Sequence, residues 1–386
     1  MKPCFELADV ICRFGPSFLD RHNPGFSQQK ALQAISLCRT AALGGHKQMC
    51  THCGHEHISY NSCRNRHCPK CQNKDREVWI QQIKDILPKS RYFHVIFTLP
   101  DSLNEWFIAF QKEMQNILFF AAWQSLEQFA NMSAYLGAKT GMIAVLHTWG
   151  QTLTLHPHLH CIVPEGGLNK EGEWVKGKKT DNRSPFLFPV IPMSRVFRGK
   201  FLSLMSKILK NKSDLKMPSI KEKHFNIHIQ PPFKEMEHLI NYLGRYTHKT
   251  AISNHRIRNI DDEGVVFSYK DYRDRNIVKE MFLTGEEFLR RFCLHIQNKG
   301  FRRIRYFGIF ASSNRKKLNQ IRIASGQAPI QSIKKKKWKE IIRETWKYDP
   351  DICPECNKGI MVTVELISPL GRPPPLNRNR IALNCK

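Results

Sequence analysis

Hydrophobic and polar residues follow two different patterns along the first half of the chain. Residues 92–99 and 142–150 are runs of β-branched and aromatic side chains, the first of them ended by Pro100, and each run predicts a strand. Between them, residues 102–136 place large apolar side chains three and four positions apart, which predicts one or two helices. Strands and helices combined in this way indicate an α+β fold.

A third predicted strand covers residues 156–163, with the sequence His-Pro-His-Leu-His-Cys-Ile-Val. Alternate side chains of a strand share a face, so His158 and His160 should point one way, while Leu159 and its alternate neighbours point toward the core. A short connection joins this strand to 142–150, which predicts two antiparallel neighbours in one sheet. Two imidazoles on one face predict a metal site.

The second half of the chain shows the same two patterns. We predict a basic amphipathic helix over residues 193–210, a short strand over 224–229, and two strands around a turn at 261–264. Thr284 and Glu287 have the spacing of a capping box, so another helix should begin there.

Two tyrosines lie four residues apart in the sequence Tyr242-Leu-Gly-Arg-Tyr246, on a helix predicted to begin after two prolines. The apolar stripe of this helix should be Met236, Leu239, Ile240 and Leu243. At 100° per residue, Tyr242 and Tyr246 lie together on one flank of that stripe, beside Arg245 and Lys249. Paired tyrosines and paired histidines suggest phosphodiester cleavage by a tyrosine nucleophile.

An ion held by two histidines needs at least one further protein ligand. A hairpin would bring either Gln151 or His147 beside His160, and His156 lies on the same strand. His147 could equally be a core histidine whose ring nitrogens are satisfied by hydrogen bonds. The sequence leaves this third ligand open.

The charge composition of the chain indicates what kind of molecule it binds. The chain carries 61 Lys and Arg residues against 33 Asp and Glu residues, a formal net charge of +28. Such a charge points to nucleic acid rather than a membrane, because no amphipathic anchor is evident. No stretch approaches the roughly 18 apolar residues that span a bilayer, and the N-terminus lacks a signal-peptide pattern. We therefore expect a soluble, cytoplasmic protein.

Cysteines cluster near the N-terminus in two Cys-x-x-Cys pairs separated by fourteen residues. This spacing lets four thiolates converge on one tetrahedral Zn²⁺. The predicted zinc ligands are Cys50, Cys53, Cys68 and Cys71. Three further residues, Cys63, His55 and His67, are surplus ligands that leave the assignment open and could serve a second ion.

Basic residues accompany both predicted sites. Arg64, Arg66 and Lys70 lie in the cysteine-rich segment, and Arg245 and Lys249 border the tyrosines. We predict that they bind DNA phosphates. The alternative for the cysteine-rich segment is a solvated basic surface.

A third Cys-x-x-Cys pair, Cys353 and Cys356, lies in a basic C-terminal region. Its only further cysteine partner there is Cys385, so the sequence leaves open whether a second complete zinc site forms. The predicted organisation has four segments: a helical lead-in (1–48), a zinc-binding domain (49–75), a catalytic domain with the two-tyrosine helix (76–312) and the basic C-terminal region (313–386).

Taken together, these motifs resemble those of the bacterial HUH rolling-circle insertion-sequence transposases of the two-tyrosine class. The resemblance covers roughly residues 45–310 and rests on the cysteines of 50–71, Phe97-Thr-Leu-Pro100, Trp149-Gly150, the histidines of 156–160 and Tyr242-Leu-Gly-Arg-Tyr246. It implies an HUH endonuclease domain, an antiparallel sheet with flanking helices, behind a small Cys-rich zinc-binding domain.

The resemblance also implies a chemistry. His158 and His160 match the HUH histidines, and Tyr242 and Tyr246 match the nucleophile pair. The implied cofactors are Mg²⁺ or Mn²⁺ for catalysis and structural Zn²⁺. The implied substrate is single-stranded DNA at transposon ends and target, cleaved through a 5′-phosphotyrosine intermediate in a bacterial, nucleoid-associated protein.

Two other functions are compatible with the same residues. A plasmid replication initiator or relaxase would use the same chemistry, although the upstream cysteine cluster argues against it. A non-enzymatic zinc-dependent DNA-binding protein with structural histidines is the alternative from a different class.

Overall fold

The computed structural model describes residues 3–177, 187–210, 218–233, 238–239, 242, 244, 249–330 and 338–370. The helices of these residues are α1 (Leu7–His22), α2 (Phe26–Ser36), α3 (Gln72–Ile86), α4 (Asn104–Ala109), α5 (Gln111–Asn131), α6 (Val190–Leu209), α8 (Gly285–Cys293), α9 (Arg315–Ala324) and α10 (Trp338–Trp346). The strands are β1 (Gly45–Cys50), β2 (Glu56–Tyr60), β3 (Tyr92–Thr98), β4 (Gly141–Trp149), β5 (Leu155–Pro164), β6 (Gly166–Leu168), β7 (Trp174–Lys176), β8 (Ile227–Ile229), β9 (Ile257–Ile260), β10 (Gly264–Asp271), β11 (Ile277–Thr284), β12 (Ile304–Gly308) and β13 (Met361–Ile367). The predicted α+β fold is confirmed.

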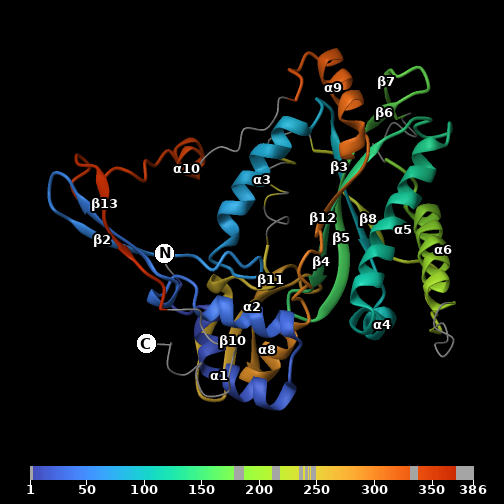
Figure 1. Cartoon of the computed structure of the whole chain (residues 1–386). Coiled ribbons are helices and arrows are strands. Elements are labelled where there is room, and N and C mark those ends of the chain that lie inside the picture. Colours follow the sequence, from blue (N-terminus) through green and yellow to red (C-terminus); the bar gives the residue numbers. More distant parts are fainter. Residues whose placement is uncertain are drawn as a thin grey trace.

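A five-stranded antiparallel sheet lies at the centre, with strand order β12-β4-β5-β3-β8. Figure 1 shows α5 and α6 on one side of this sheet and α3 on the other. Leu159, Cys161 and Val163 are fully buried in the core that includes residues of α5 and α6. Strands β4 and β5 are antiparallel neighbours. The expected pairing and the expected inward face of the histidine strand are both confirmed.

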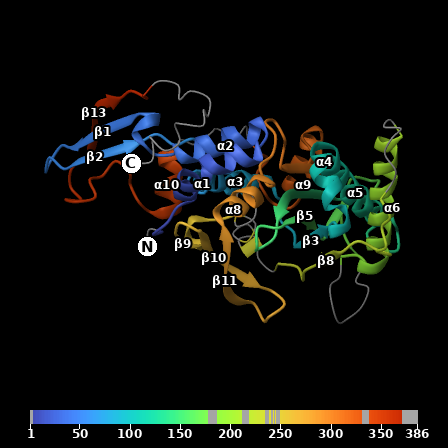
Figure 2. The same ribbon diagram turned by 90° about the horizontal axis from the view of Figure 1, so that it is seen from below.

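Helices α1 and α2 pack against a second unit made of α8 and the antiparallel sheet β11-β10-β9 (Figure 2). Their shared core contains Phe14, Ile35, Phe267 and Phe288, all buried. Thr284 precedes α8, and its side chain accepts a hydrogen bond from the Glu287 backbone N–H at 3.4 Å. The predicted helix cap is therefore present, and it adds to the stability of α8.

A three-stranded ribbon, β13-β1-β2, stands at one end of the molecule, away from the central sheet (Figures 1 and 2). Its outer strand β13 comes from the C-terminal region, and it pairs antiparallel with β1 from Gly45↔Ile367 to Cys50↔Met361. The predicted helical lead-in therefore ends before residue 45, where β1 begins. The sheet thus joins a segment of the N-terminal region to a segment of the C-terminal region.

The structure also contains elements predicted for the second half of the chain. The helix expected over 193–210 is α6, the strand expected over 224–229 is reduced to β8, and the turn at 261–264 joins β9 to β10. In the predicted tyrosine helix, Leu239 is fully buried, whereas Met236, Ile240 and Leu243 lie outside the described residues. None of the described helices has the length and apolarity needed to cross a bilayer.

Candidate active site and cysteine clusters

Three histidines converge on one face of the central sheet. His147 on β4 is the register partner of His158 on β5, and His160 follows two residues later on the same face. Their nearest ring nitrogens all lie within 4.8 Å of one another. His147 and His160 are buried, and His158 is partly buried. Strand pairing thus assembles three imidazoles that the sequence places in two separate motifs.

The hydrogen bonds around these rings determine which nitrogens carry protons. His158 Nδ1 donates to the carbonyl of His156 at 2.7 Å. His94 Nδ1 donates to the amide oxygen of Gln230 at 3.0 Å, so its Nε2 accepts from His160 Nδ1 at 2.9 Å. Both His158 and His160 therefore turn an unprotonated Nε2 toward the other, at 3.1 Å.

That arrangement fits a divalent cation. Two unprotonated nitrogens facing each other repel, and a cation between them reverses this interaction. Two nitrogens bound side by side to one ion at about 2.1 Å would lie about 3 Å apart, in agreement with the 3.1 Å between the two Nε2 atoms. Hydrogen bonding of the other ring nitrogen to a fixed acceptor is typical of metal-binding histidines.

Burial keeps these imidazoles neutral. Removal from water lowers the pKa of His94 and of His158 to about 4 and lowers the pKa of His160 well below its ordinary value, because the charged imidazolium loses hydration. The positive charge of Lys249 acts in the same direction on His158 and His160. At neutral pH the site presents the uncharged form that binds metal.

Tyr242 lies beside this histidine chain. Its hydroxyl is 3.3 Å from His94 Nδ1, and its ring meets that of His94 edge-on at a centroid distance of 5.1 Å. Gly244, two residues on, approaches α3 so closely that a Cβ there would come within 2.4 Å of the Ile80 side chain. Tyr246 and Arg245 lie outside the described residues. One ring, His94, thus connects a predicted nucleophile to a predicted metal ligand.

The two candidates for the third ligand have different surroundings. The Gln151 amide donates to the Tyr272 hydroxyl at 3.2 Å, and its oxygen accepts from the Lys270 backbone N–H at 3.4 Å. Its side chain is therefore engaged by the β10–β11 hairpin. Among the described residues that could hold an ion, the histidine cluster includes His147 and does not include His156.

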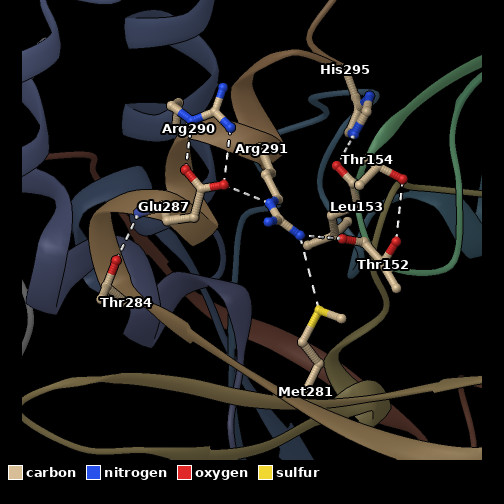
Figure 3. A network of polar contacts seen from close by, with 9 residues as sticks. All are labelled: Thr152, Leu153, Thr154, Met281, Thr284, Glu287, Arg290, Arg291 and His295. Carbon is tan, nitrogen blue, oxygen red and sulfur yellow. Dashed lines mark hydrogen bonds and ion pairs between the residues drawn. The ribbon is translucent and has the colours of Figure 1, made fainter. Parts of the chain in front are cut away.

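The connection between the two histidine strands is held from α8 (Figure 3). Arg291 donates to the Thr152 carbonyl at 3.1 Å and is itself held by Glu287 at 2.6 Å. His295 Nε2 donates to the Leu153 carbonyl at 3.0 Å. These bonds hold the loop between β4 and β5, whereas the register that places His147 opposite His158 is that of the strand pairing itself.

The four predicted zinc ligands do not come together. The structure places Cys68 and Cys71 with Cys38 and Cys63, in a cluster we call the first cysteine cluster. Its sulfurs lie 3.5 Å apart for Cys38 and Cys71, and 3.6 Å apart for Cys63 and Cys71. Cys38 lies beyond the end of α2, in the segment predicted to be a separate lead-in.

The other half of the predicted quartet joins the C-terminal region. Cys50 and Cys53 lie with Cys353 and Cys356 in what we call the second cysteine cluster. The third Cys-x-x-Cys pair is therefore not isolated, because the pairing of β1 with β13 brings it beside the first pair. The prediction that Cys385 was its only available partner is wrong.

Among the surplus ligands, Cys63 belongs to the first cluster, whereas His55 and His67 belong to neither described cluster. The Nε2 of His67 instead accepts a hydrogen bond from the Gln297 backbone N–H at 3.3 Å. Burial lowers the pKa of His67 to about 3, so it is a neutral core histidine.

The predicted DNA-binding residues divide into two groups. Arg66 donates to the carbonyls of Asn298 and Phe301 at 2.5 and 2.6 Å, and Lys70 pairs with Glu6 at 2.6 Å. Arg64 and Lys249 have exposed side chains. The first two side chains hold the fold together, and the other two remain accessible to phosphate.

Sequence reasoning missed two residues of these sites, His94 and Cys38. His94 stands as a lone histidine in an apolar strand, where a buried structural role is the default interpretation. The missed signal was register, because the pairing of β3 with β5 puts His94 opposite Ile162 and hence on the face of His160.

Comparison with known proteins relates the chain to transposases. Residues 141–317 match the family model "Putative transposase", and residues 10–99 match "Transposase zinc-binding domain". The chain is 38% identical to "Putative transposase y4qJ" of Sinorhizobium fredii, over 96% of this chain and 97% of that protein. It is 30% identical to "Transposase for insertion sequence element IS801" of Pseudomonas savastanoi pv. phaseolicola, over 71% of this chain and 68% of that protein. No solved structure matches it.

The chain is a transposase, a DNA-processing enzyme, with an N-terminal zinc-binding domain. This class is defined by the fold, the cysteine clusters and these matches. Within that class, the chain belongs to the IS91-type family of rolling-circle transposases.

Proposed function

We propose that this transposase nicks and rejoins single-stranded DNA at the ends of its element, with Tyr242 as a nucleophile. The observation that carries the proposal is the position of the Tyr242 hydroxyl, 3.3 Å from His94 Nδ1, while His94 Nε2 bonds to His160 at 2.9 Å. A nucleophile should lie beside the site that orients the phosphate, and His94 connects Tyr242 to that site.

Three histidines would hold the catalytic ion. His147, His158 and His160 supply three ring nitrogens on one face of the sheet, with water or phosphate oxygens as the other ligands of the proposed Mg²⁺ or Mn²⁺. Nitrogen donors favour Mn²⁺ over the harder Mg²⁺. The ion, when bound, would polarise a phosphate oxygen and orient the scissile bond. His147 is preferred to Gln151 because the Gln151 amide is engaged by Tyr272.

His94 would help the tyrosine react. A phenol has an ordinary pKa of about 10, so attack by its oxygen needs a neighbour that stabilises developing negative charge. The Nδ1–H of His94 faces both Gln230 and the Tyr242 oxygen and can donate to that oxygen as it loses its proton. Lys249, which lies close enough to lower the pKa of His158 and His160, adds positive charge to the same region.

The bond changes follow from this geometry. The tyrosine oxygen forms a bond to phosphorus, and the bond from phosphorus to the 3′ oxygen breaks, leaving a 5′-phosphotyrosine and a free 3′-hydroxyl. The proton lost by the phenol is balanced by the proton gained by the 3′ oxygen. The reverse attack by a 3′-hydroxyl rejoins the strand, so the bond energy is conserved without ATP.

We propose further that Tyr242 and Tyr246 alternate as nucleophiles. One would hold the first cut end while the other makes the second cut, because the helix predicted from the sequence would place them about one turn, roughly 6 Å, apart. Arg64 and Lys249 would bind the backbone of the DNA, whereas Arg66 and Lys70, which the fold already uses, would contribute less.

Covalent adduct formation tests the proposal. Labelled single-stranded oligonucleotides that tile the DNA flanking the encoding gene are incubated with the protein and Mn²⁺, and adducts are resolved on a denaturing gel. Each of Tyr242→Phe and Tyr246→Phe should retain some adduct and the double variant none, with the exposed Tyr272→Phe as a matched control. Adduct in the double variant would overturn the proposal. DNA binding without any adduct from wild-type protein would favour a non-enzymatic DNA-binding protein.

A further inference from the structure

We propose that Cys50, Cys53, Cys353 and Cys356 form a second zinc site, which joins the N-terminal hairpin to the C-terminal region in one zinc ribbon. The first cysteine cluster lies wholly within the matched zinc-binding domain, residues 10–99. The second takes half of its ligands from residues 353–356, outside both matched regions. This inference does not depend on the nicking chemistry proposed above.

The sulfur positions fit tetrahedral zinc. The Sγ atoms of Cys50 and Cys356 lie 3.6 Å apart and those of Cys53 and Cys353 lie 3.8 Å apart, with all four within 4.8 Å of one another. Four sulfurs at about 2.3 Å from one Zn²⁺ would lie about 3.8 Å apart. A disulfide would need about 2.05 Å, so these are thiols gathered around a point and not oxidised pairs.

Both Cys-x-x-Cys pairs adopt the same turn. The backbone N–H of Gly54 donates to the Cys50 carbonyl at 3.2 Å, and that of Asn357 donates to the Cys353 carbonyl at 3.0 Å. Both of these residues have left-handed φ values, 72° for Gly54 and 52° for Asn357. Two segments 300 residues apart in the sequence thus form matching knuckles that face each other.

Backbone N–H groups also point at the sulfurs. The Cys53 N–H donates to Cys50 Sγ at 3.5 Å and the Gly359 N–H donates to Cys356 Sγ at 3.4 Å. Such donors stabilise the thiolate, which is the form that binds zinc. Gly359 is required for the close approach of the two segments, because a Cβ there would lie 2.4 Å from Cys50 Sγ.

The surrounding structure fixes the second knuckle in place. Thr51 and Ile360 exchange hydrogen bonds of 3.0 and 3.1 Å beside the cysteines. On the other side, Arg343 of α10 bonds to Asp349 at 3.0 Å and Asp351 at 2.7 Å, just before Cys353. A two-stranded hairpin is marginally stable alone, so β1 and β2 depend on β13 and on the metal that holds it.

Zinc content of purified, reduced full-length protein tests the site. Wild-type protein should bind two Zn²⁺ in all-sulfur sites, and Cys353→Ser/Cys356→Ser protein should bind one. Cys50→Ser/Cys353→Ser should also leave one, because both changes affect the same site, whereas Cys50→Ser/Cys68→Ser should leave none. The exposed Cys4→Ser is the matched control and should keep two.

The competing arrangement, a single site made of Cys50, Cys53, Cys68 and Cys71, gives the opposite pattern. Cys353→Ser/Cys356→Ser would then keep the wild-type zinc content, and that result would overturn the proposal. A measurement without substitutions covers the case of variants that fail to fold. Cadmium-113 NMR of the substituted wild-type protein should show two all-thiolate signals, and one signal alone would also overturn it.

Discussion

Replacing His94 by leucine should weaken metal binding, although His94 is not itself one of the proposed ligands. Leucine has nearly the volume of histidine, so the change removes hydrogen bonds without opening a large cavity. His94 is fully buried, and its two ring nitrogens bond to His160 at 2.9 Å and Gln230 at 3.0 Å. After the substitution, the His160 Nδ1–H has lost its acceptor and that ring is no longer held in one tautomer.

The substitution should lower both the stability of the protein and its affinity for Mn²⁺. A buried polar group left without its partner costs about 1–3 kcal/mol, and Gln230 is only partly buried, so we expect the free energy of unfolding to fall by about 2–4 kcal/mol. Loss of a hydrogen-bond partner behind a metal ligand typically weakens metal affinity or activity 10–100-fold, so the Kd for Mn²⁺ should rise by roughly that factor.

Mn²⁺ binding is measured at pH 7.5 from the electron paramagnetic resonance of the free ion, with chemical denaturation run in parallel. His295→Leu is the matched control. His295 is equally buried, but its ring nitrogens bond to Thr148 and Leu153, so it should lose stability and keep its Mn²⁺ affinity. His94→Gln, which can still accept from His160, should recover part of the affinity. A folded His94→Leu protein with a Kd within about twofold of wild type would refute the reasoning.

Two further predictions concern the same face of the molecule and its surroundings. His147→Ala should raise the Kd for Mn²⁺ at least about tenfold, because loss of a ligand should cost no less than loss of an outer-shell partner. Gln151→Ala should leave the Kd unchanged because the Gln151 amide bonds to Tyr272; the reverse result in the same titration would restore Gln151 as the ligand. Burial lowers the pKa of His295 from 6.5 to about 4, so the folded protein binds fewer protons than the unfolded chain between these values and loses up to about 3 kcal/mol of stability as the pH falls through them. His295→Gln should reduce that acid dependence in denaturation curves at pH 7 and pH 5, and an unchanged slope would contradict it.

Local patterns in the sequence predicted the central sheet well. Alternation of side chains alone placed Leu159 in the core and His158 and His160 together on the opposite face, because a strand has a period of two. The hairpin between 142–150 and 156–163 followed from a short connection. These properties depend on neighbouring residues, and the sequence displays them directly.

Long-range pairing was not visible in the same way. Two Cys-x-x-Cys pairs fourteen residues apart have the spacing of one zinc site, yet the pairing of β1 with β13 separates them into different clusters. The choice between His147 and Gln151 depended on the register of the hairpin, which the loop length left ambiguous. His94 required knowledge of which strand lies beside β5.

The pairing of β1 with β13 has a consequence for synthesis. Cys53 and Cys353, which face each other across the second cluster, are 300 residues apart. At about 5–20 residues per second, roughly 15–60 s separate the emergence of the two from the ribosome. Throughout that interval the β1–β2 hairpin lacks its third strand and Cys50 and Cys53 lack their partners. The sheet β13-β1-β2 is therefore completed only after residue 367 has been made. A product truncated before residue 353 lacks both β13 and half of the second cysteine cluster.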